Sequence, residues 1–425
     1  MRSSDITILE SEVDFEAVEL STPLILGSGA VKRFTVARVR VVAADRQGRT
    51  ATGTGTSVLS VPWSWPRSTL SFDERDIVLR DLCVRLAGTL SWLEAADPIR
   101  LCGELSATLP ELARPVGAEP VPQLAALLCL GAVDNAVHDA WSRVAGGSAY
   151  HLYTADYLND DLGAVDSSLA GRYPGEFLTA PRERLPVQHV VSPGDPLTPA
   201  DRADGYRPLV DWCRTERLRH FKIKVLGRDP HEDADRIGAV YDTVRAGAPD
   251  ATLAVDPNES YSSLEALDEL ADALRKRHPD AASAIAYVEQ PIPRSMALVP
   301  RPFPFPVLMD EGSSDLGSLP ELARTGWSGL VVKAGKGQTY ALVANAYAKV
   351  HGLFLTVQDL TTVDLALRHS ARLASVLHPS APHLEYNSRQ YAPHANARLS
   401  VTHPELTGVR DGAVRVGPLD TDGIY

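Results

Sequence analysis

The sequence predicts an α/β protein in which a parallel (β/α) barrel follows an N-terminal α+β unit. From about residue 185, short apolar runs alternate with amphipathic segments, as repeated βα units do. Before that point, a strand-like run is followed by a long stretch of helical periodicity. The 425 residues suffice for a barrel of about 250 residues together with a second unit.

Strands and turns are expected in the first 60 residues. Residues 34–43, FTVARVRVVA, are alternating and apolar, while glycines mark candidate loops at Gly27, Gly29, Gly53 and Gly55. Helical periodicity then covers residues 73–147 and is clearest over 122–144. These patterns together predict an α+β unit.

Eight apolar runs have the length of buried strands, and helical segments separate most of them. The runs cover residues 186–191, 220–225, 251–256, 284–289, 304–310, 329–333, 352–358 and 383–386. The helical segments cover residues 230–246, 262–277, 339–350 and 364–377. Residues 192–217 form a longer connection than a βα unit needs, which indicates an insertion. Eight parallel strands predict a closed barrel.

Polar side chains follow these runs where each strand ends, and a barrel of this kind builds its active site at that rim. The strand-end residues are Lys222, Lys224, Asp256, Asn258, Glu289, Asp310, Glu311, Lys333 and Glu385. A single strand-end carboxylate is more often a helix cap than a ligand. The whole set is difficult to explain by capping, because burying these charges without a function would cost several kcal/mol each.

Three successive strands end in carboxylates at Asp256, Glu289 and Asp310. Because their mutual repulsion calls for a counter-ion, we expect a hard divalent cation among them. Magnesium accepts carboxylates and leaves positions for substrate oxygens, whereas zinc would favour His or Cys ligands. Glu311, which follows Asp310 directly, is the alternative third ligand.

Lysine is scarce in this chain: only 7 of the 42 basic residues are lysines, and the others are arginines. Four of the seven lie in two short stretches, at Lys222 and Lys224 and at Lys333 and Lys336. The period of two along a strand points Lys222 and Lys224 to the same side, into the barrel. Arginine cannot lose its proton in proteins, so this placement indicates positions that need a titratable amine.

In combination and in this order, the motifs FKIKV, VDPNES, YVEQPI, LMDEGS and LVVKAG resemble the enolase superfamily, in particular its muconate-lactonizing and mandelate-racemase-like branches. The resemblance implies an α+β capping domain over residues 1–150, with lid loops near residues 20–30 and 52–66. It implies a modified (β/α)7β TIM-type barrel over 151–400, and a return of residues 401–425 to the capping domain.

The same resemblance implies site roles. Asp256, Glu289 and Asp310 would hold Mg²⁺, which in this superfamily stabilises an enediolate formed from a substrate carboxylate. Lys224 and Lys333 would be the acid/base groups on opposite faces of the substrate, with Lys336 as a second candidate beside Lys333. The remaining roles fall to Lys222, which would neutralise the substrate carboxylate and depress the pKa of Lys224, and to the substrate-binding residues Glu385 and Asn258.

The expected reaction is abstraction of the α-proton of a small-molecule carboxylate, most directly as a racemase or epimerase. A cycloisomerase or acid-sugar dehydratase of the same superfamily, or a non-catalytic binding module, are the alternatives. The seventh run ends in Val357-Gln358-Asp359, so the histidine of mandelate racemase is missing. The last run contains Glu385-Tyr386-Asn387 in place of the Asp-x-Asp pair of many dipeptide epimerases.

The composition limits the classes of binding partner that we expect. A net charge of −12 argues against nucleic acid or an anionic membrane as the main partner, because both are negatively charged. The N-terminus lacks a signal-peptide pattern, and the longest apolar run, residues 124–133, is too short to cross a bilayer, so a cytoplasmic protein is expected. The cysteines have no metal-type spacing and are expected to be reduced core residues. Family resemblance favours a homo-oligomer.

Overall fold

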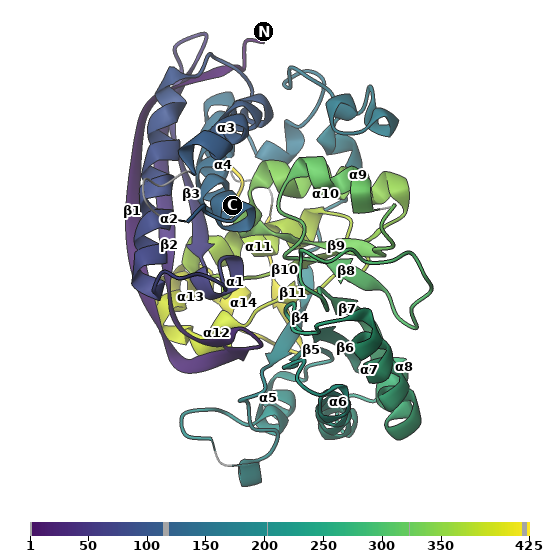
Figure 1. Ribbon diagram of the computed structural model, residues 1–425. Helices are drawn as coiled ribbons and strands as arrows, with labels where there is room; N and C mark the ends of the chain where they lie inside the picture. The colour runs from purple at the N-terminus through teal and green to yellow at the C-terminus, as the bar shows by residue number, and fades with distance from the viewer. Residues whose placement is uncertain (1, 114–118, 202, 323, 419–422) are drawn as a thin grey trace.

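The computed structural model describes residues 2–113, 119–201, 203–322, 324–418 and 423–425. An N-terminal antiparallel sheet with its helices packs beside a curled parallel sheet that is surrounded by helices (Figure 1). The predicted fold class, an α/β barrel with an N-terminal α+β unit, is therefore confirmed. Among the described residues, no helix is long and apolar enough to cross a membrane.

The N-terminal unit, called the cap below, is a three-stranded sheet of order β1-β2-β3 with four helices. Its strands are β1 (Ile6–Leu26), β2 (Gly29–Asp45) and β3 (Thr50–Leu59), and its helices are α1 (Val61–Ser64), α2 (Phe72–Thr89), α3 (Pro98–Leu112) and α4 (Gln123–Ala145). Helix α2 begins at a capping box, in which Ser71 and Glu74 each accept the other's backbone N–H. Helix α4 is buried along almost its whole length and packs on β3.

The prediction of loops at Gly53 and Gly55 was wrong, because both residues lie inside β3. Their function is close packing. A Cβ atom on Gly55 would lie 2.2 Å from the carbonyl oxygen of Ala132 and 2.3 Å from the backbone nitrogen of Ala136. Glycine therefore lets the backbone of α4 approach β3 directly. Because this contact requires glycines within the strand, the sequence there lacks the apolar pattern that predicts a strand.

Gly55→Ala is expected to lower the free energy of unfolding by about 3 kcal/mol, because the added methyl group overlaps backbone that cannot rotate away. Gly88→Ala is the matched control, since Gly88 lies in α2 and a Cβ there would meet nothing within 4 Å. The control should leave stability unchanged or raise it by up to about 1 kcal/mol. Chemical denaturation measures both, and equal stability of the two variants would contradict this account of β3.

The barrel contains all eight predicted strands in one parallel sheet of order β10-β9-β8-β7-β6-β5-β4-β11. The strands are β4 (Arg184–Val191), β5 (His220–Lys224), β6 (Thr252–Asp256), β7 (Ile285–Glu289), β8 (Val307–Met309), β9 (Gly329–Lys333), β10 (Phe354–Gln358) and β11 (Leu384–Glu385). A parallel bridge between Thr356 and Ala381 connects β10 to the segment before β11 and closes the barrel.

Helices connect most of the strands and cover the outside of the barrel (Figure 1). They are α5 (Leu209–Glu216), α6 (Pro230–Arg245), α7 (Leu264–Arg277), α8 (Pro279–Ala284), α9 (Leu319–Leu322), α10 (Gln338–His351) and α11 (Asp364–Val376). The four predicted helical segments correspond to α6, α7, α10 and α11. The long connection at 192–217 contains α5, so its extra length precedes the helix of an ordinary βα unit.

After β11 the chain forms α12 (Ser388–Tyr391), α13 (Ala397–Thr402) and α14 (Pro404–Thr407), and then β12 (Ala413–Arg415). Strand β12 pairs antiparallel with β4 of the barrel. The last described residues contact the cap: Tyr150 donates a hydrogen bond to the carbonyl of Ile424, and Tyr425 donates one to the carbonyl of Thr54. The domain boundaries at residues 150 and 400 remain a prediction.

Candidate active site

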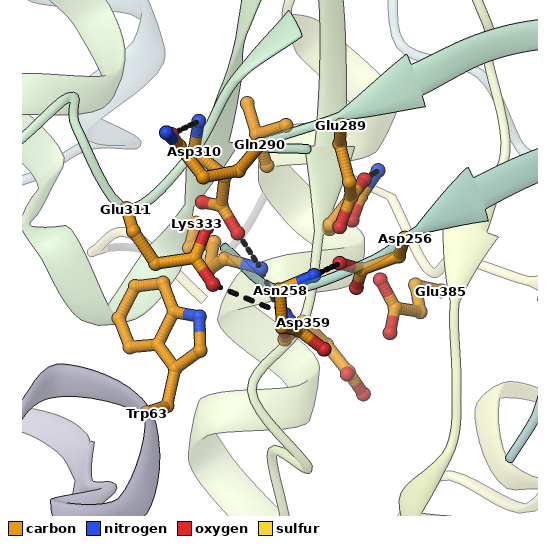
Figure 2. Close-up of polar contacts among 12 residues, drawn as sticks. Trp63, Asp256, Asn258, Glu289, Gln290, Asp310, Glu311, Lys333, Asp359 and Glu385 are labelled. Carbon is orange, nitrogen blue, oxygen red and sulfur yellow. Dashed lines mark hydrogen bonds and ion pairs between the residues drawn. The ribbon is translucent and has the colours of Figure 1, made fainter. Parts of the chain in front are cut away.

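The strand-end residues expected from the sequence meet at one rim of the barrel (Figure 2), and all of them except the half-buried Asn258 are buried there. The sheet register brings neighbours together, since Lys224 is paired with Asp256 and Lys333 with Gln358. Three strands with carboxylates at their ends lie between the lysines of β5 and the lysine that ends β9. Ion pairs join neighbouring strands, as between Lys224 and Asp256, and also cross the barrel, as between Lys222 and Glu289.

Lys224 occupies one side of the cluster. Its Nζ atom donates to Asp256 Oδ2 at 2.5 Å and to Asn258 Oδ1 at 2.9 Å. Asn258 adopts a positive φ of 46°, which asparagine tolerates better than most residues, and its Nδ2 donates to Glu311 Oε1 at 3.0 Å. Burial opposes ionisation of Asp256, but Lys224 and Lys222 outweigh it and hold the pKa of this carboxyl below its ordinary value.

Lys222 lies deeper in the barrel, between three carboxylates. Its Nζ is 2.7 Å from Glu289 Oε1, 2.8 Å from Glu385 Oε2 and 3.4 Å from Asp256 Oδ2. Burial lowers the pKa of Lys222, but Glu289 and Glu385 outweigh it and raise that pKa well above the ordinary value. Lys222 is thus a permanent positive charge in this arrangement.

Lys333 occupies the opposite side. Its Nζ is 3.1 Å from Asp310 Oδ2 and donates to the carbonyl of Asp359 at 3.1 Å. Against the opposing effect of burial, Asp310 raises the pKa of Lys333. Trp63, which α1 of the cap supplies, places its ring 5.2 Å from the same ammonium group (Figure 2). A cation over an aromatic face at this distance is attracted to it, so Trp63 covers Lys333.

Lys336, the second candidate beside Lys333, is held by backbone. Its Nζ donates to the carbonyls of Asp310 at 2.7 Å and Val331 at 3.4 Å, and to Asp310 Oδ1 at 3.3 Å. Burial lowers the pKa of Lys336 to about 8. Because three acceptors already surround its ammonium group, Lys336 holds the backbone and the carboxylate of Asp310 in place.

The two candidates for the third ligand differ in environment. Asp310 is flanked by Lys333 and Lys336, which overcome the effect of burial and lower its pKa. For Glu311, burial and then Asp310 raise the pKa to about 8. Gln290 also fixes the strand end, since its Oε1 accepts the backbone N–H groups of Asp310 and Gly312, each at 3.0 Å. Asp310 is therefore the better-ionised and better-positioned carboxylate.

The donor set fits a hard divalent cation. Among the residues that the structure describes, Glu289 Oε1 and Asp310 Oδ2 accept no aligned hydrogen bond, although each lies near a lysine ammonium group. Six buried carboxylates and four lysines share the cluster, so full ionisation leaves two negative charges. The carboxylates are Asp256, Glu289, Asp310, Glu311, Asp359 and Glu385, and the lysines are Lys222, Lys224, Lys333 and Lys336. Mg²⁺ would balance this charge with the oxygen ligands that it prefers.

Cap residues close the pocket above the cluster. Leu24, Leu26, Val31 and Phe34 from the β1–β2 hairpin line it together with Trp63. The pocket that they line with the cluster has a volume of about 30 Å³, which is room for a water molecule. Arg294 also ties the cap to the barrel by donating to the carbonyl of Trp63 at 3.3 Å. A lid role of residues 20–30 and 52–66 remains a prediction.

Sequence reasoning missed several residues of the cluster. Asp359 directly follows β10, and burial, followed by Glu385, raises its pKa to about 8. Gln358 bonds both Lys222 and Glu289, and Asn387 donates to Glu385 Oε1 at 3.3 Å. Their position at the end of the seventh predicted strand was the signal that could have identified Gln358 and Asp359.

A second group of metal-capable side chains lies in the cap and at its contact with α10. Cys102, Asp134 and His138 are close together and buried. Thr339 provides hydrogen-bond partners for two of these side chains. Its hydroxyl donates to Asp134 Oδ1 at 2.6 Å and lies 2.8 Å from His138 Nε2. Hydrogen bonding thus accounts for these residues without an ion. All four cysteines are free, and Cys83, Cys102 and Cys129 are buried as expected, whereas Cys213 is only half-buried.

Comparisons with known proteins agree with this arrangement. The sequence model of a family described as enolase C-terminal domain-like matches residues 208–420. A chloromuconate cycloisomerase from Pseudomonas sp. (strain P51) is 25% identical over 197 residues, which make up 45% of this chain and 42% of that protein. The match therefore spans less than half the length of that relative.

Solved structures match over nearly the whole chain. The 2-chloromuconate cycloisomerase from Rhodococcus opacus 1CP has a TM-score of 0.65 at 19% identity, covering 98% of this chain and 96% of that one. The L-Ala-D/L-Glu epimerase from Bacillus subtilis has a TM-score of 0.64 at 17% identity, covering 98% of each chain. At these identities the likeness shows the fold.

Proposed function

Because the chain belongs to the enolase superfamily through its enolase C-terminal domain-like segment, we propose that it is a Mg²⁺-dependent enzyme that abstracts the α-proton of a carboxylate substrate. The reaction that its site supports best is racemisation or epimerisation. One observation carries the proposal: two buried lysines, Lys224 and Lys333, stand on opposite sides of a carboxylate cluster.

The positions of the two lysines follow from the barrel order. Lys224 ends β5 and Lys333 ends β9, and strands β6, β7 and β8 with their carboxylates lie between them. A substrate held on those carboxylates would therefore present one face of its α-carbon to each lysine. Removal of a proton by one lysine and delivery by the other inverts the configuration at that carbon.

Each residue of the cluster has a distinct part in this proposal. Asp256, Glu289 and Asp310 would hold the cation, which supplies charge to polarise the substrate carboxylate and relieves the lysines of their carboxylate partners. Lys222 keeps its proton and supplies a fixed positive charge near the substrate carboxylate. Lys224 and Lys333 move the proton, and the apolar cap residues with Trp63 exclude water.

Cycloisomerisation is the second candidate, favoured by the similarity to the Pseudomonas chloromuconate cycloisomerase. The same cluster supports it if only one of Lys224 and Lys333 moves a proton. In either case the partner is a small-molecule carboxylate. A homo-oligomeric state and a cytoplasmic location remain predictions.

The test is a screen of acid sugars, N-acylamino acids and dipeptides in D₂O with Mg²⁺. We expect at least one carboxylate to acquire deuterium at its α-carbon, starting from either configuration, as measured by NMR. EDTA should stop the exchange. Cyclisation of a muconate without such exchange would favour the second candidate, and failure of the protein to bind Mg²⁺ would favour a non-catalytic binding module instead.

A further inference from the structure

Gln358, at the end of β10, connects two parts of the cluster that the proposed function uses separately. Its Oε1 accepts a short hydrogen bond from the ammonium group of Lys222. Its Nε2 donates to Glu289 Oε2 at 2.6 Å and to the hydroxyl oxygen of Tyr287 at 2.9 Å. Gln358 is fully buried, so these contacts are not shared with bulk water.

The partners of Gln358 allow only one orientation of its amide. An ammonium group can only donate, so it must face the carbonyl oxygen, and a carboxylate can only accept, so it must face the amino group. A flipped amide would place donor against donor at Lys222 and acceptor against acceptor at Glu289. The side chain is thereby locked between a lysine and a proposed metal ligand.

From this geometry we propose that Gln358 is a positioning residue for the metal and substrate site. It occupies Glu289 Oε2 and so leaves Oε1 as the oxygen that Glu289 can offer to a cation. It also fixes the ammonium group of Lys222 between Glu289 and Glu385, where that group would meet the substrate carboxylate. The inference rests on the proposed function and deepens it.

Two further buried side chains, those of Tyr287 and Gln188, hold Gln358 in place through a chain of hydrogen bonds. The hydroxyl oxygen of Tyr287 accepts from Gln358 and also from Gln188 Nε2 at 3.0 Å. Gln188 lies on β4 and Tyr287 on β7, so the network ties β10 to strands across the barrel. Removing the Tyr287 hydroxyl would loosen Gln358 without touching Lys222 or Glu289 directly.

The experiment is calorimetric titration of Mg²⁺ into the full-length protein and its variants. We expect Gln358→Leu to weaken Mg²⁺ binding by about 10- to 100-fold, the usual effect of losing a hydrogen-bond partner of a metal ligand. Tyr287→Phe should weaken binding in the same direction by less. Val357→Ala is the matched control, because Val357 is a fully buried apolar residue of the same strand and its side chain points to the opposite face of the sheet from Gln358.

The outcomes separate this inference from the proposed function. Wild-type affinity in Gln358→Leu and Tyr287→Phe, together with lost binding in Asp256→Asn, would overturn the role of Gln358 and leave the proposed function standing. Absence of Mg²⁺ binding in the wild type would overturn both. Equal weakening in Val357→Ala would also overturn the inference, since the effect would then be a general disturbance of β10. If Gln358→Leu does not fold, Tyr287→Phe decides.

Discussion

Lys224→Ala should abolish deuterium exchange from one configuration of the substrate and leave exchange from the other. The physical reason is that Lys224 reaches only one side of the carboxylate cluster, through Asp256 and Asn258, while Lys333 lies on the other side. Loss of a general base typically costs about 10²- to 10⁴-fold in rate. NMR in D₂O with each substrate configuration measures the effect.

Lys333→Ala should produce the mirror result, and either variant should lose overall racemisation. Lys224→Arg separates charge from proton transfer, because arginine keeps the positive charge but cannot act as a base near neutral pH. Lys349→Ala is the matched control, since Lys349 is an exposed lysine near the end of α10. Full activity in Lys224→Ala would refute the two-lysine mechanism. Loss of exchange from both configurations in that variant would favour a one-base reaction.

Asp256→Asn should weaken Mg²⁺ binding by at least about 100-fold. Loss of a residue that only hydrogen-bonds to a metal ligand already lowers metal affinity by roughly 10- to 100-fold, and loss of a ligand itself should cost more. Asp256 is the carboxylate that lies closest to Lys224, and Lys224 and Lys222 keep it ionised against the effect of burial. The amide removes a negative charge and one anionic ligand oxygen while keeping the shape of the side chain. Calorimetric titration measures the affinity, and circular dichroism confirms the fold.

Asp195→Asn is the control for this substitution. Asp195 is a half-buried aspartate that accepts hydrogen bonds from the backbone of Ser192 and from Tyr391, away from the lysine and carboxylate cluster. Mg²⁺ affinity should be unchanged in this variant. Wild-type affinity in Asp256→Asn would show that the three strand-end carboxylates are not the metal site, and would remove the basis of the proposed mechanism.

The eight barrel strands were predictable because each is a short apolar run next to a helical pattern, and both signals are local in sequence. The strand-end charges were predictable for a related reason. Parallel strands place their carboxyl ends on one rim, so Lys224, Asp256, Glu289 and Asp310 had to approach one another once the barrel was assumed. Their types and order along the chain were sufficient to predict that these side chains gather, and the structure places them together at one rim.

Other features depend on contacts between distant segments, which no local pattern records. The strand position of Gly55 needs a glycine because α4, about 80 residues later in the sequence, packs against it. Trp63 covers Lys333, which lies 270 residues away along the chain. The preference for Asp310 over Glu311 depends on which carboxylate faces Lys333 and Lys336. Gln358 acquires its role only from three partners on other strands.

The sequence by itself thus determined the barrel, its eight strands and most of the charges at its rim, because periodicity and strand-end position are properties of neighbouring residues. The tertiary structure decided which charges pair, which amide orients them and which cap side chains close the pocket. Pairing and burial depend on distances between side chains that are far apart along the chain, and those distances exist only in the folded protein.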